Sequence, residues 1–506
     1  MDNNTNLDFS NEFDVRVAKL NMLEQSGEKG YKAKFNKTHE IHDLDKYELG
    51  TIVSVAGRLV AKRTFGKLIF ARLYAIGDNF ETDNLKEVRY NIQISLNEKI
   101  LGEEMLQKFK DFSDIGDFYG VQGELIRTNT GELTIQVSSF TLLSKALRSL
   151  PEKFHGLTDI ETRYRQRYLD LIANERSREI ILTRFKVMQF IREFYIKNGF
   201  LEIETPVLQN AVSGALAEPF KTHHNALDLD MNLRISPETF HKRTIACGFD
   251  KIFEFAKDFR NEGLCANKLQ EFTMLESYAA YWDFEDSIKF YTEMFRETCK
   301  FIHGDYKFVK GDKEIVLPEV FPRLDYIATL NKIVGFDILS ITDAEQFKQM
   351  LIKDNLLPAS ELENQYTVGG MIDLLYKRKM RPFITEPTIL YNYPNIIPLA
   401  RHNDDDDRII DMFQLVIDGQ EMVKGYSELV NPIQQKHSFE EQALAKEKGD
   451  LEAMDYDKDY ILAMEHGFPP ISGIGFGIDI FLLHLLDCEN IRDTILFPIV
   501  KPEENK

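Results

Sequence analysis

An arginine and a glutamate flank a glycine-containing loop in the stretch 253–276. A strand-like run with phenylalanines at even spacing ends at Arg260, and a second apolar run closes on Glu276. Because alternation on both sides of a loop predicts an antiparallel hairpin, Arg260 and Glu276 are expected on paired strands, meeting over one face. A guanidinium opposite a carboxylate suits a ligand that carries both a negative and a positive group.

A second predicted hairpin spans residues 412–431. Its strands alternate around Asp418-Gly419, a pair typical of a type I′ turn. Its polar face is marked by Gln414, Glu421 and Glu428.

Near the end of the chain, glycines alternate in the run 473–479, which includes Gly475 and Gly477. Alternate glycines leave one face of a strand without side chains, so that a flat ligand can approach the backbone. A glycine-rich strand is more often a packing device, and the pattern alone does not separate these readings.

Length and composition indicate what kind of protein holds these residues in place. A chain of 506 residues predicts two to four domains. Hydrophobic content of 43% and charged content of 28% are typical of soluble globular proteins. No apolar run is long enough for a membrane span, and the acidic, polar start is unlike a signal peptide. The cysteines are scattered, which favours reduced thiols and a cytoplasmic location.

The formal net charge of −20 argues weakly against nucleic acid as a partner. A basic face can nevertheless lie on an acidic body, and basic residues gather around residues 62–67, 145–153 and 163–178. Solvated surface charge is the simpler interpretation of these clusters.

The order of elements predicts an α+β protein. Residues 1–48 suggest an acidic tail and one helix, and 144–175 form a charged linker. Between 49 and 143, five strands with a helix between the third and fourth predict an OB-fold barrel. Such barrels bind single-stranded nucleic acid with aromatic and basic residues, a role that Arg63, Phe70 and Gln93 could serve. Alternatively, Phe70 belongs to the core. Residues 176–506 form the larger domain, with an insertion at about 286–387.

Several stretches, in order, resemble bacterial-type class II lysyl-tRNA synthetases: TRYRQRYLDL, FLEIETP, LRISPE, FRNEG with EFTMLE, YSEL, and GIGFGID with IRDTILFP. The resemblance covers nearly the whole chain. It implies an anticodon-binding OB barrel followed by a six-stranded antiparallel catalytic sheet flanked by helices. It also implies a homodimer that couples lysine to ATP with Mg²⁺ and then transfers lysyl to tRNA.

The resemblance assigns roles by position. The arginine that holds the substrate carboxylate and the α-phosphate is Arg260, and Glu238 takes the α-ammonium. The ε-ammonium side comprises Glu276, Tyr278, Tyr426 and Glu428. The nucleotide would contact Arg260, Lys268, Phe272, Gly475 and Gly477, and Glu421 would bind metal. The anticodon readers are Arg63, Phe70, Gln93 and Glu132.

The residues that would bind the triphosphate of ATP, here called the triphosphate end of the site, depart from the family pattern. Ile480 stands where the family has an arginine, and the run from Asn267 to Gln270 replaces Arg-His-Asn-Pro. Gln414 replaces one of two metal-binding carboxylates, and Lys424 replaces an asparagine of the lysine pocket. We expect the Lys424 ammonium to pair with Glu421 or Glu428.

Two hypotheses follow. In the first, the chain is a divergent paralogue that binds tRNA and lysine, with adenylate formation weakened or lost, because cations must position the β- and γ-phosphates. In the second, it is an active lysine–tRNA ligase with a rebuilt triphosphate site. The residues favour the first, and lysine-dependent ATP–pyrophosphate exchange separates the two.

Overall fold

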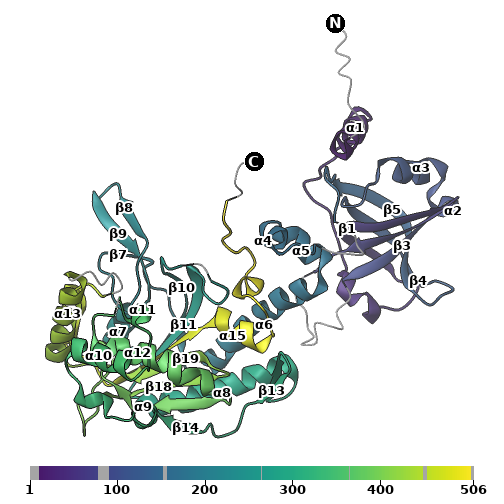
Figure 1. The fold of residues 1–506 in the computed structure, drawn as a ribbon. Coiled ribbons are helices and arrows are strands. Elements are labelled where there is room, and N and C mark those ends of the chain that lie inside the picture. Colours follow the sequence, from purple (N-terminus) through teal and green to yellow (C-terminus); the bar gives the residue numbers. More distant parts are fainter. Residues whose placement is uncertain are drawn as a thin grey trace. The chain divides into compact units, whose positions relative to one another are not determined.

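A computed structural model describes residues 11–77, 90–151, 157–263, 265–363, 365–447 and 453–502. The polar start of the chain, residues 1–10, lies outside them. Contacts divide the chain into two units, Met1–Glu179 and Ile180–Lys506. Helix α6 (Glu175–Lys197) carries the chain from the first unit into the second (Figure 1).

The first unit contains a closed five-stranded barrel with the order β1-β2-β3-β5-β4. Its strands are β1 (Ile52–Phe65), β2 (Leu68–Tyr74), β3 (Asn91–Asn97), β4 (Phe118–Arg127) and β5 (Leu133–Ser144). Inward positions such as Val53, Ile69 and Ile94 are fully buried, as the period of two in strands requires. Its helices are α1 (Glu12–Gln25), α2 (Glu98–Leu101), α3 (Glu103–Phe112), α4 (Ile160–Arg165) and α5 (Arg167–Ala173).

The second unit is built on an eight-stranded sheet with the order β14-β15-β18-β19-β20-β11-β10-β6. The strands are β14 (Arg323–Asp325), β15 (Thr388–Tyr391), β18 (Met412–Ile417), β19 (Gln420–Ser427), β20 (Ile471–Gly477), β11 (Glu271–Ala280), β10 (Lys251–Phe259) and β6 (Leu201–Glu202). The strands from β15 to β10 pair antiparallel, whereas the edge strands β14 and β6 pair parallel. The predicted fold class is confirmed, and the expected antiparallel sheet gains a parallel strand at each edge.

One face of this sheet is apolar. Phe253, Leu275 and Phe476 are fully buried there, in one core with residues of α6, α8 (Phe284–His303) and α15 (Ile478–Leu485). Helix α8 begins with a capping box at Asp283 and ends at Gly304 in the left-handed conformation, so its bounds follow from local sequence.

The other face carries the polar residues. Between the paired strands, Gln414 lies opposite Lys424, Lys424 opposite Gly475, and Gly475 opposite Glu276. Opposed residues of antiparallel strands share a face, so these four form one row across the sheet. Helix α7 (Glu238–Ala246) contacts β10 and β11.

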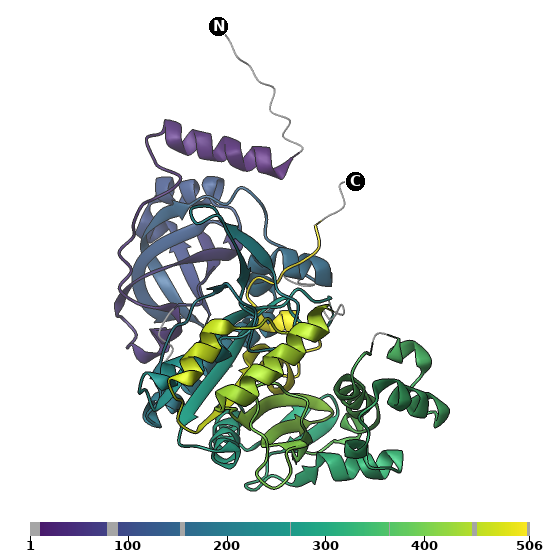
Figure 2. The same cartoon turned by 90° about the vertical axis from the view of Figure 1, so that its left-hand side faces the viewer.

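Around the sheet lie smaller elements. The helical insertion forms a second core with residues of β18 and appears as a group of green helices in Figure 2: α9 (Tyr326–Val334), α10 (Ala344–Lys353), α11 (Ala359–Leu362) and α12 (Val368–Lys379). Three small sheets comprise β7 (Leu208–Gln209), β9 (Leu229–Leu233) and β8 (Lys221–His224); β12 (Lys307–Lys310) and β13 (Lys313–Val316); and β16 (Tyr393–Pro394) and β17 (Ile409–Ile410). The remaining helices are α13 (Pro432–Glu447) and α14 (Lys458–Glu465). None of the described helices combines the length and apolarity needed to cross a membrane.

Candidate functional site

The first predicted hairpin is confirmed as β10 and β11, but its arginine and glutamate do not contact each other. Among the described residues, the Arg260 guanidinium donates to the Ile235 carbonyl oxygen at 3.3 and 3.4 Å and lies 5.1 Å over the Phe272 ring. Glu276 instead accepts from the Ser236 hydroxyl at 3.0 Å. The expected meeting of Arg260 and Glu276 is therefore wrong, because the register places Glu276 opposite Glu254, well before the end of β10.

A buried lysine connects the carboxylates of the predicted amino-acid site. The Lys242 ammonium lies 2.6 Å from Glu238 Oε1 and also forms an ion pair with Glu428. The Tyr426 hydroxyl donates to the same Glu238 oxygen at 2.7 Å. Lys242 is completely buried, one turn after Glu238 on α7. Sequence reasoning missed Lys242, although its spacing of four from Glu238 is typical of helical ion pairs.

The glycine strand makes room for this cluster. Tyr278 donates to Glu276 Oε2 at 3.0 Å, and Tyr278 lies opposite Gly473 in the sheet. A Cβ atom on Gly473 would overlap both the Tyr278 ring and the Glu428 carboxylate. Glu238, Glu276, Tyr278, Tyr426 and Glu428 are thus brought together, with Gly473 serving close packing.

Burial sets the electrostatics of the cluster. It raises the pKa of Glu276 well above its ordinary value, and the negative charges of Asp258 and Glu238 raise it further. Burial also raises the pKa of Glu428 well above its ordinary value, although Lys242 opposes that shift. Burial alone would lower the pKa of Lys242, yet Glu238 and Glu428 hold it above its usual range. A cluster in which carboxylates outnumber cations favours a ligand that brings ammonium groups.

Asp258 is another buried carboxylate, and it shares the ligand face of the sheet with Glu276. It is completely buried, and its nearest ion-pair partner is Arg234 at 3.4 Å. Burial raises its pKa to about 7, although Arg260 and Arg234 oppose the shift. The Arg260 guanidinium, which is predicted to receive a ligand carboxylate, thus lies in the field of this group.

The predicted triphosphate contacts do not form a cationic site. Lys268 is exposed and is already paired with Glu262 at 2.9 Å, and Asn267 is exposed on the same loop. Ile480 is a half-buried apolar residue at the start of α15, where its Cγ2 lies close to Gly477. The nearby Arg184 is buried and forms an ion pair with Asp479, so its charge is engaged inside the fold.

The predicted anticodon residues lie together on the outside of the barrel. Arg63 is opposite Phe70, and Gln93 is between Arg72 and Thr134 in the sheet. Phe70 is half-buried beside the buried Ile69, so it faces outward and does not belong to the core. The exposed Phe65 ring contacts Phe70, and Glu132 forms an ion pair with Arg72. Sequence reasoning missed Phe65 and Arg72, which continue the alternation of β1 and β2.

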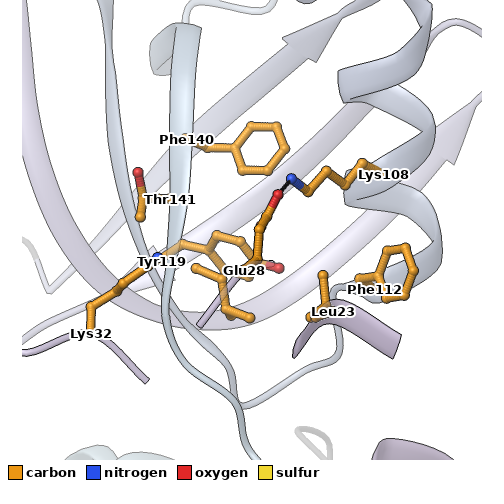
Figure 3. Close-up of a pocket in the computed structure, with 9 residues that line it drawn as sticks. Leu23, Glu28, Lys32, Lys108, Phe112, Tyr119, Phe140 and Thr141 are labelled. Carbon is orange, nitrogen blue, oxygen red and sulfur yellow. Dashed lines mark hydrogen bonds and ion pairs between the residues drawn. The ribbon is translucent and has the colours of Figure 1, made fainter. Parts of the chain in front are cut away.

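The first unit also contains a separate cavity of about 220 Å³, shown in Figure 3. Leu23, Phe112 and Phe140 line it, and an ion pair between Glu28 and Lys108 crosses it. Two of its charged groups, Glu28 and Lys108, are therefore paired with each other, and Lys32 also lines the cavity.

Comparison with known proteins identifies the family. The model of class II tRNA synthetases for aspartate, lysine and asparagine (D, K and N) matches residues 159–501. The lysine–tRNA ligase of Aquifex aeolicus is 41% identical over 96% of this chain and 78% of the relative. Those of Listeria monocytogenes and Lactococcus lactis subsp. lactis are each 39% identical, over 99% and 98% of this chain and 99% of each relative. The chain belongs to the class II lysyl-tRNA synthetases.

Class II synthetases generally use ATP and Mg²⁺, and the metal position of this synthetase can be tested on its donors. Gln414 Oε1 accepts from the Tyr393 hydroxyl at 2.7 Å and from the Tyr376 hydroxyl at 3.2 Å. Glu421 accepts from the Arg381 guanidinium at 3.1 Å. No group of three or more His, Cys, Asp or Glu in the described ranges could hold a metal. Magnesium prefers carboxylate oxygens, so these residues do not fit the ion.

Lys424 differs from its expected pairing. Glu428 is paired with Lys242 and Glu421 with Arg381, and Lys424 forms no ion pair with either in the described parts of the chain. The expectation is wrong because Lys242 and Arg381 already form ion pairs with these two carboxylates. Burial lowers the pKa of Lys424, although Glu421 opposes that shift.

Proposed function

We propose that this protein is a lysyl-tRNA synthetase-like protein that binds lysine and a tRNA with a lysine-type anticodon, with ATP-dependent formation of lysyl-adenylate weakened or lost. One contrast carries the proposal. The amino-acid end is a connected network of carboxylates, hydroxyls and Lys242, whereas the polar groups of the triphosphate end are bonded inside the protein.

Charge balance supports lysine as the ligand. Glu238, Glu276 and Glu428 face one internal ammonium, that of Lys242, so unbalanced negative charge remains when all are ionised. The two ammonium groups of lysine supply the missing positive charge, and Arg260 is available for the ligand carboxylate. An amino acid with one ammonium would leave a buried carboxylate unpaired, which is costly.

Activation of lysine by ATP needs more than recognition of the amino acid. Adenylate formation expels pyrophosphate, and the loss of one arginine that stabilises such a transition state can cost roughly 10³-fold in rate. Here Ile480 and Asn267 occupy both arginine positions, and Lys268 is paired with Glu262. Phe272, Gly475 and Gly477 remain as surfaces for the adenosine part of a nucleotide.

The outward face of the barrel supports tRNA binding. Phe70, with Phe65 beside it, offers a platform for base stacking, while Arg63, Gln93 and Glu132 supply charge and hydrogen bonds around it. In a tRNA binding assay, Phe70→Ala is expected to weaken binding by roughly tenfold, since stacking contributes about 1–3 kcal/mol per base. Equal binding by wild type and Phe70→Ala would reject this face.

We also propose a homodimer and a cytoplasmic location. Phe185 and Ile196 of α6 are 50% and 54% exposed, and Leu201 of β6 is 54% exposed, so the segment assigned to the dimer interface presents apolar surface. Sedimentation of the full chain tests this, and a monomer at micromolar concentration would contradict it.

Lysine-dependent ATP–pyrophosphate exchange, run beside a calorimetric titration with lysine, tests the proposed function. The expected result is saturable lysine binding with exchange at least about 10³-fold below that of a relative that retains both arginines. Robust exchange would overturn the proposal and make the chain an active lysine–tRNA ligase with a rebuilt triphosphate site. Absence of lysine binding would reject the amino-acid assignment.

A further inference from the structure

The end of the β18–β19 hairpin gathers several polar groups on the ligand face. A bulge between Leu415 and Val416 changes the register, so that Val416 lies opposite Glu421 while Gln414 lies opposite Lys424. Without the bulge, Glu421 and Lys424, three residues apart, would face opposite sides of the sheet. With it, Gln414, Glu421 and Lys424 share one face.

Side chains of the protein bond to Gln414 and Glu421, the two residues at the expected metal position. Tyr376 and Tyr393 are buried and donate to the single amide oxygen of Gln414, which uses both of its lone pairs. The Arg381 guanidinium neutralises Glu421. A divalent cation would have to displace these donors and would lie close to two fixed positive charges, Arg381 and Lys424.

Lys424 is the cation of this group that remains available. It is half-buried, and its ammonium forms no hydrogen bond or ion pair within the described part of the chain. Its neighbour in the sheet is Gly475, which has no side chain, and a Cβ atom there would lie 3.1 Å from the Met274 Cε atom. Beyond Gly475 lies Glu276 of the amino-acid cluster. The ammonium therefore lies between the amino-acid end and the hairpin end of the site.

We propose that Lys424 binds the phosphate of a nucleoside monophosphate without a divalent cation, and that Mg-ATP is not the ligand of this site. The inference rests on the proposed function, in which lysine is recognised but not activated. A monophosphate carries about two negative charges, and the Lys424 ammonium would balance one of them. A triphosphate carries more charge, and the groups that would meet its outer phosphates are already paired or apolar.

The test is a calorimetric titration of the full chain, saturated with lysine, with AMP and with ATP, in excess MgCl₂ and in EDTA. The AMP affinity is expected to change by less than about twofold between the two conditions, and ATP is expected to bind no more tightly with magnesium. Electron paramagnetic resonance with MnCl₂ in place of MgCl₂ is expected to show no protein-bound ion. Magnesium-dependent tightening of ATP binding by tenfold or more, or a stoichiometric bound Mn²⁺, would overturn the proposal.

Variants assign the effect to Lys424. Lys424→Met is expected to weaken AMP binding by about 10- to 100-fold, as for the loss of a charged hydrogen bond. Lys377→Met is the matched control: Lys377 is exposed, pairs with Asp373 at 2.6 Å, and its charge acts on Lys424. If both variants bind AMP equally, Lys424 is not the phosphate ligand and the proposal fails.

The outcomes separate this inference from the proposed function. Lysine binding without exchange, together with magnesium-dependent ATP binding, would reject the inference and retain the proposed function. Robust exchange would reject both, because it requires ATP in this site. Absence of lysine binding together with metal-independent AMP binding through Lys424 would reject the proposed function and retain the assignment of Lys424. The paired change Gln414→Glu with Lys424→Asn removes the ammonium and restores a carboxylate, and it is expected to create Mn²⁺ binding where the wild type has none.

Discussion

Raising the pH at which lysine is titrated should increase its affinity, because binding releases protons from the site. Burial raises the pKa of Glu276 and of Glu428 well above their ordinary values. An ammonium placed beside a carboxyl group favours its ionised form and lowers its pKa. The ligand therefore displaces protons that the free protein holds, and the equilibrium shifts toward the complex as protons become scarcer.

The two carboxyl groups are not equivalent. Glu428 already contacts the Lys242 ammonium, which offsets part of its shift, whereas Glu276 contacts only the hydroxyls of Ser236 and Tyr278 among the described residues. Glu276 should therefore supply most of the effect. One proton released per lysine corresponds to about 1.4 kcal/mol, or tenfold in affinity, for each pH unit. The affinity should therefore rise with pH, by up to about tenfold per pH unit, over the range in which Glu276 of the free protein is still protonated.

Calorimetry in phosphate and in Tris measures the proton number directly, because the observed enthalpy changes with the ionisation enthalpy of the buffer. We expect net proton release on lysine binding, up to one proton per lysine from the Glu276 carboxyl group. Glu276→Gln is the matched control, since it keeps the shape and an oxygen for the Ser236 and Tyr278 hydroxyls but cannot titrate. A buffer-independent enthalpy, or proton uptake, would refute the assignment of Glu276 to the ammonium side.

Three further predictions concern single residues. Lys242→Met leaves Glu238 and Glu428 without their shared cation and should destabilise the second unit by about 3–5 kcal/mol at pH 8. The loss should be smaller at lower pH, because burial raises the pKa of Glu428 well above its ordinary value and a protonated carboxyl group needs no cation. Thermal unfolding that shows the same loss at pH 6 and pH 8 would contradict the reasoning. Gly473→Ala forces a methyl group into the site and should weaken lysine binding at least about tenfold, at a cost of about 1–3 kcal/mol in stability; calorimetry showing wild-type affinity would contradict it. Because burial raises the pKa of Asp258 to about 7, folding favours its protonated form, and stability is lost as pH rises from about 4 to about 7. Asp258→Asn should therefore remove this loss and stabilise the protein above pH 7 by at most about 4 kcal/mol, measured as melting temperature against pH; an unchanged profile would exclude the effect.

Local patterns in the sequence predict much of this architecture. The hairpin of β10 and β11 follows from alternation, and the turn at Asp418 and Gly419 has positive φ at both residues, as a type I′ turn requires. Gly199, also at positive φ, ends α6 where the glycine predicts it. These features depend on residues close in the chain, so a sequence pattern is sufficient.

Features that depend on distant contacts could not be predicted. The partners of Gln414 are Tyr376 and Tyr393, which come from the helical insertion and the segment after it, and nothing in their local sequence marks them. The bulge beside Val416 is equally hidden, because both registers preserve an alternating pattern. The missing contact between Arg260 and Glu276 has the same origin: alternation predicts pairing but not how far the strands extend past each other.

The replacements at positions 414 and 424 depend on each other, because both residues lie beside Glu421 and its partner Arg381. A buried polar group must be hydrogen-bonded, and Gln414 accepts from two buried tyrosine hydroxyls. The bulge in the hairpin places residue 414 and Glu421 on the same face of the sheet. In the family pattern, residue 414 is a carboxylate. Two neighbouring carboxylates there, one of them the half-buried Glu421, would favour a cation between them, and Arg381 and Lys424 supply positive charge at this place. Restoring Glu at position 414 alone would therefore bury a charge with no added counter-ion, whereas restoring an arginine at position 480 alone would leave the hairpin end unchanged. At this end of the site, Gln414 and Glu421 are thus bonded to side chains of the protein itself, which is the arrangement that the proposed function requires.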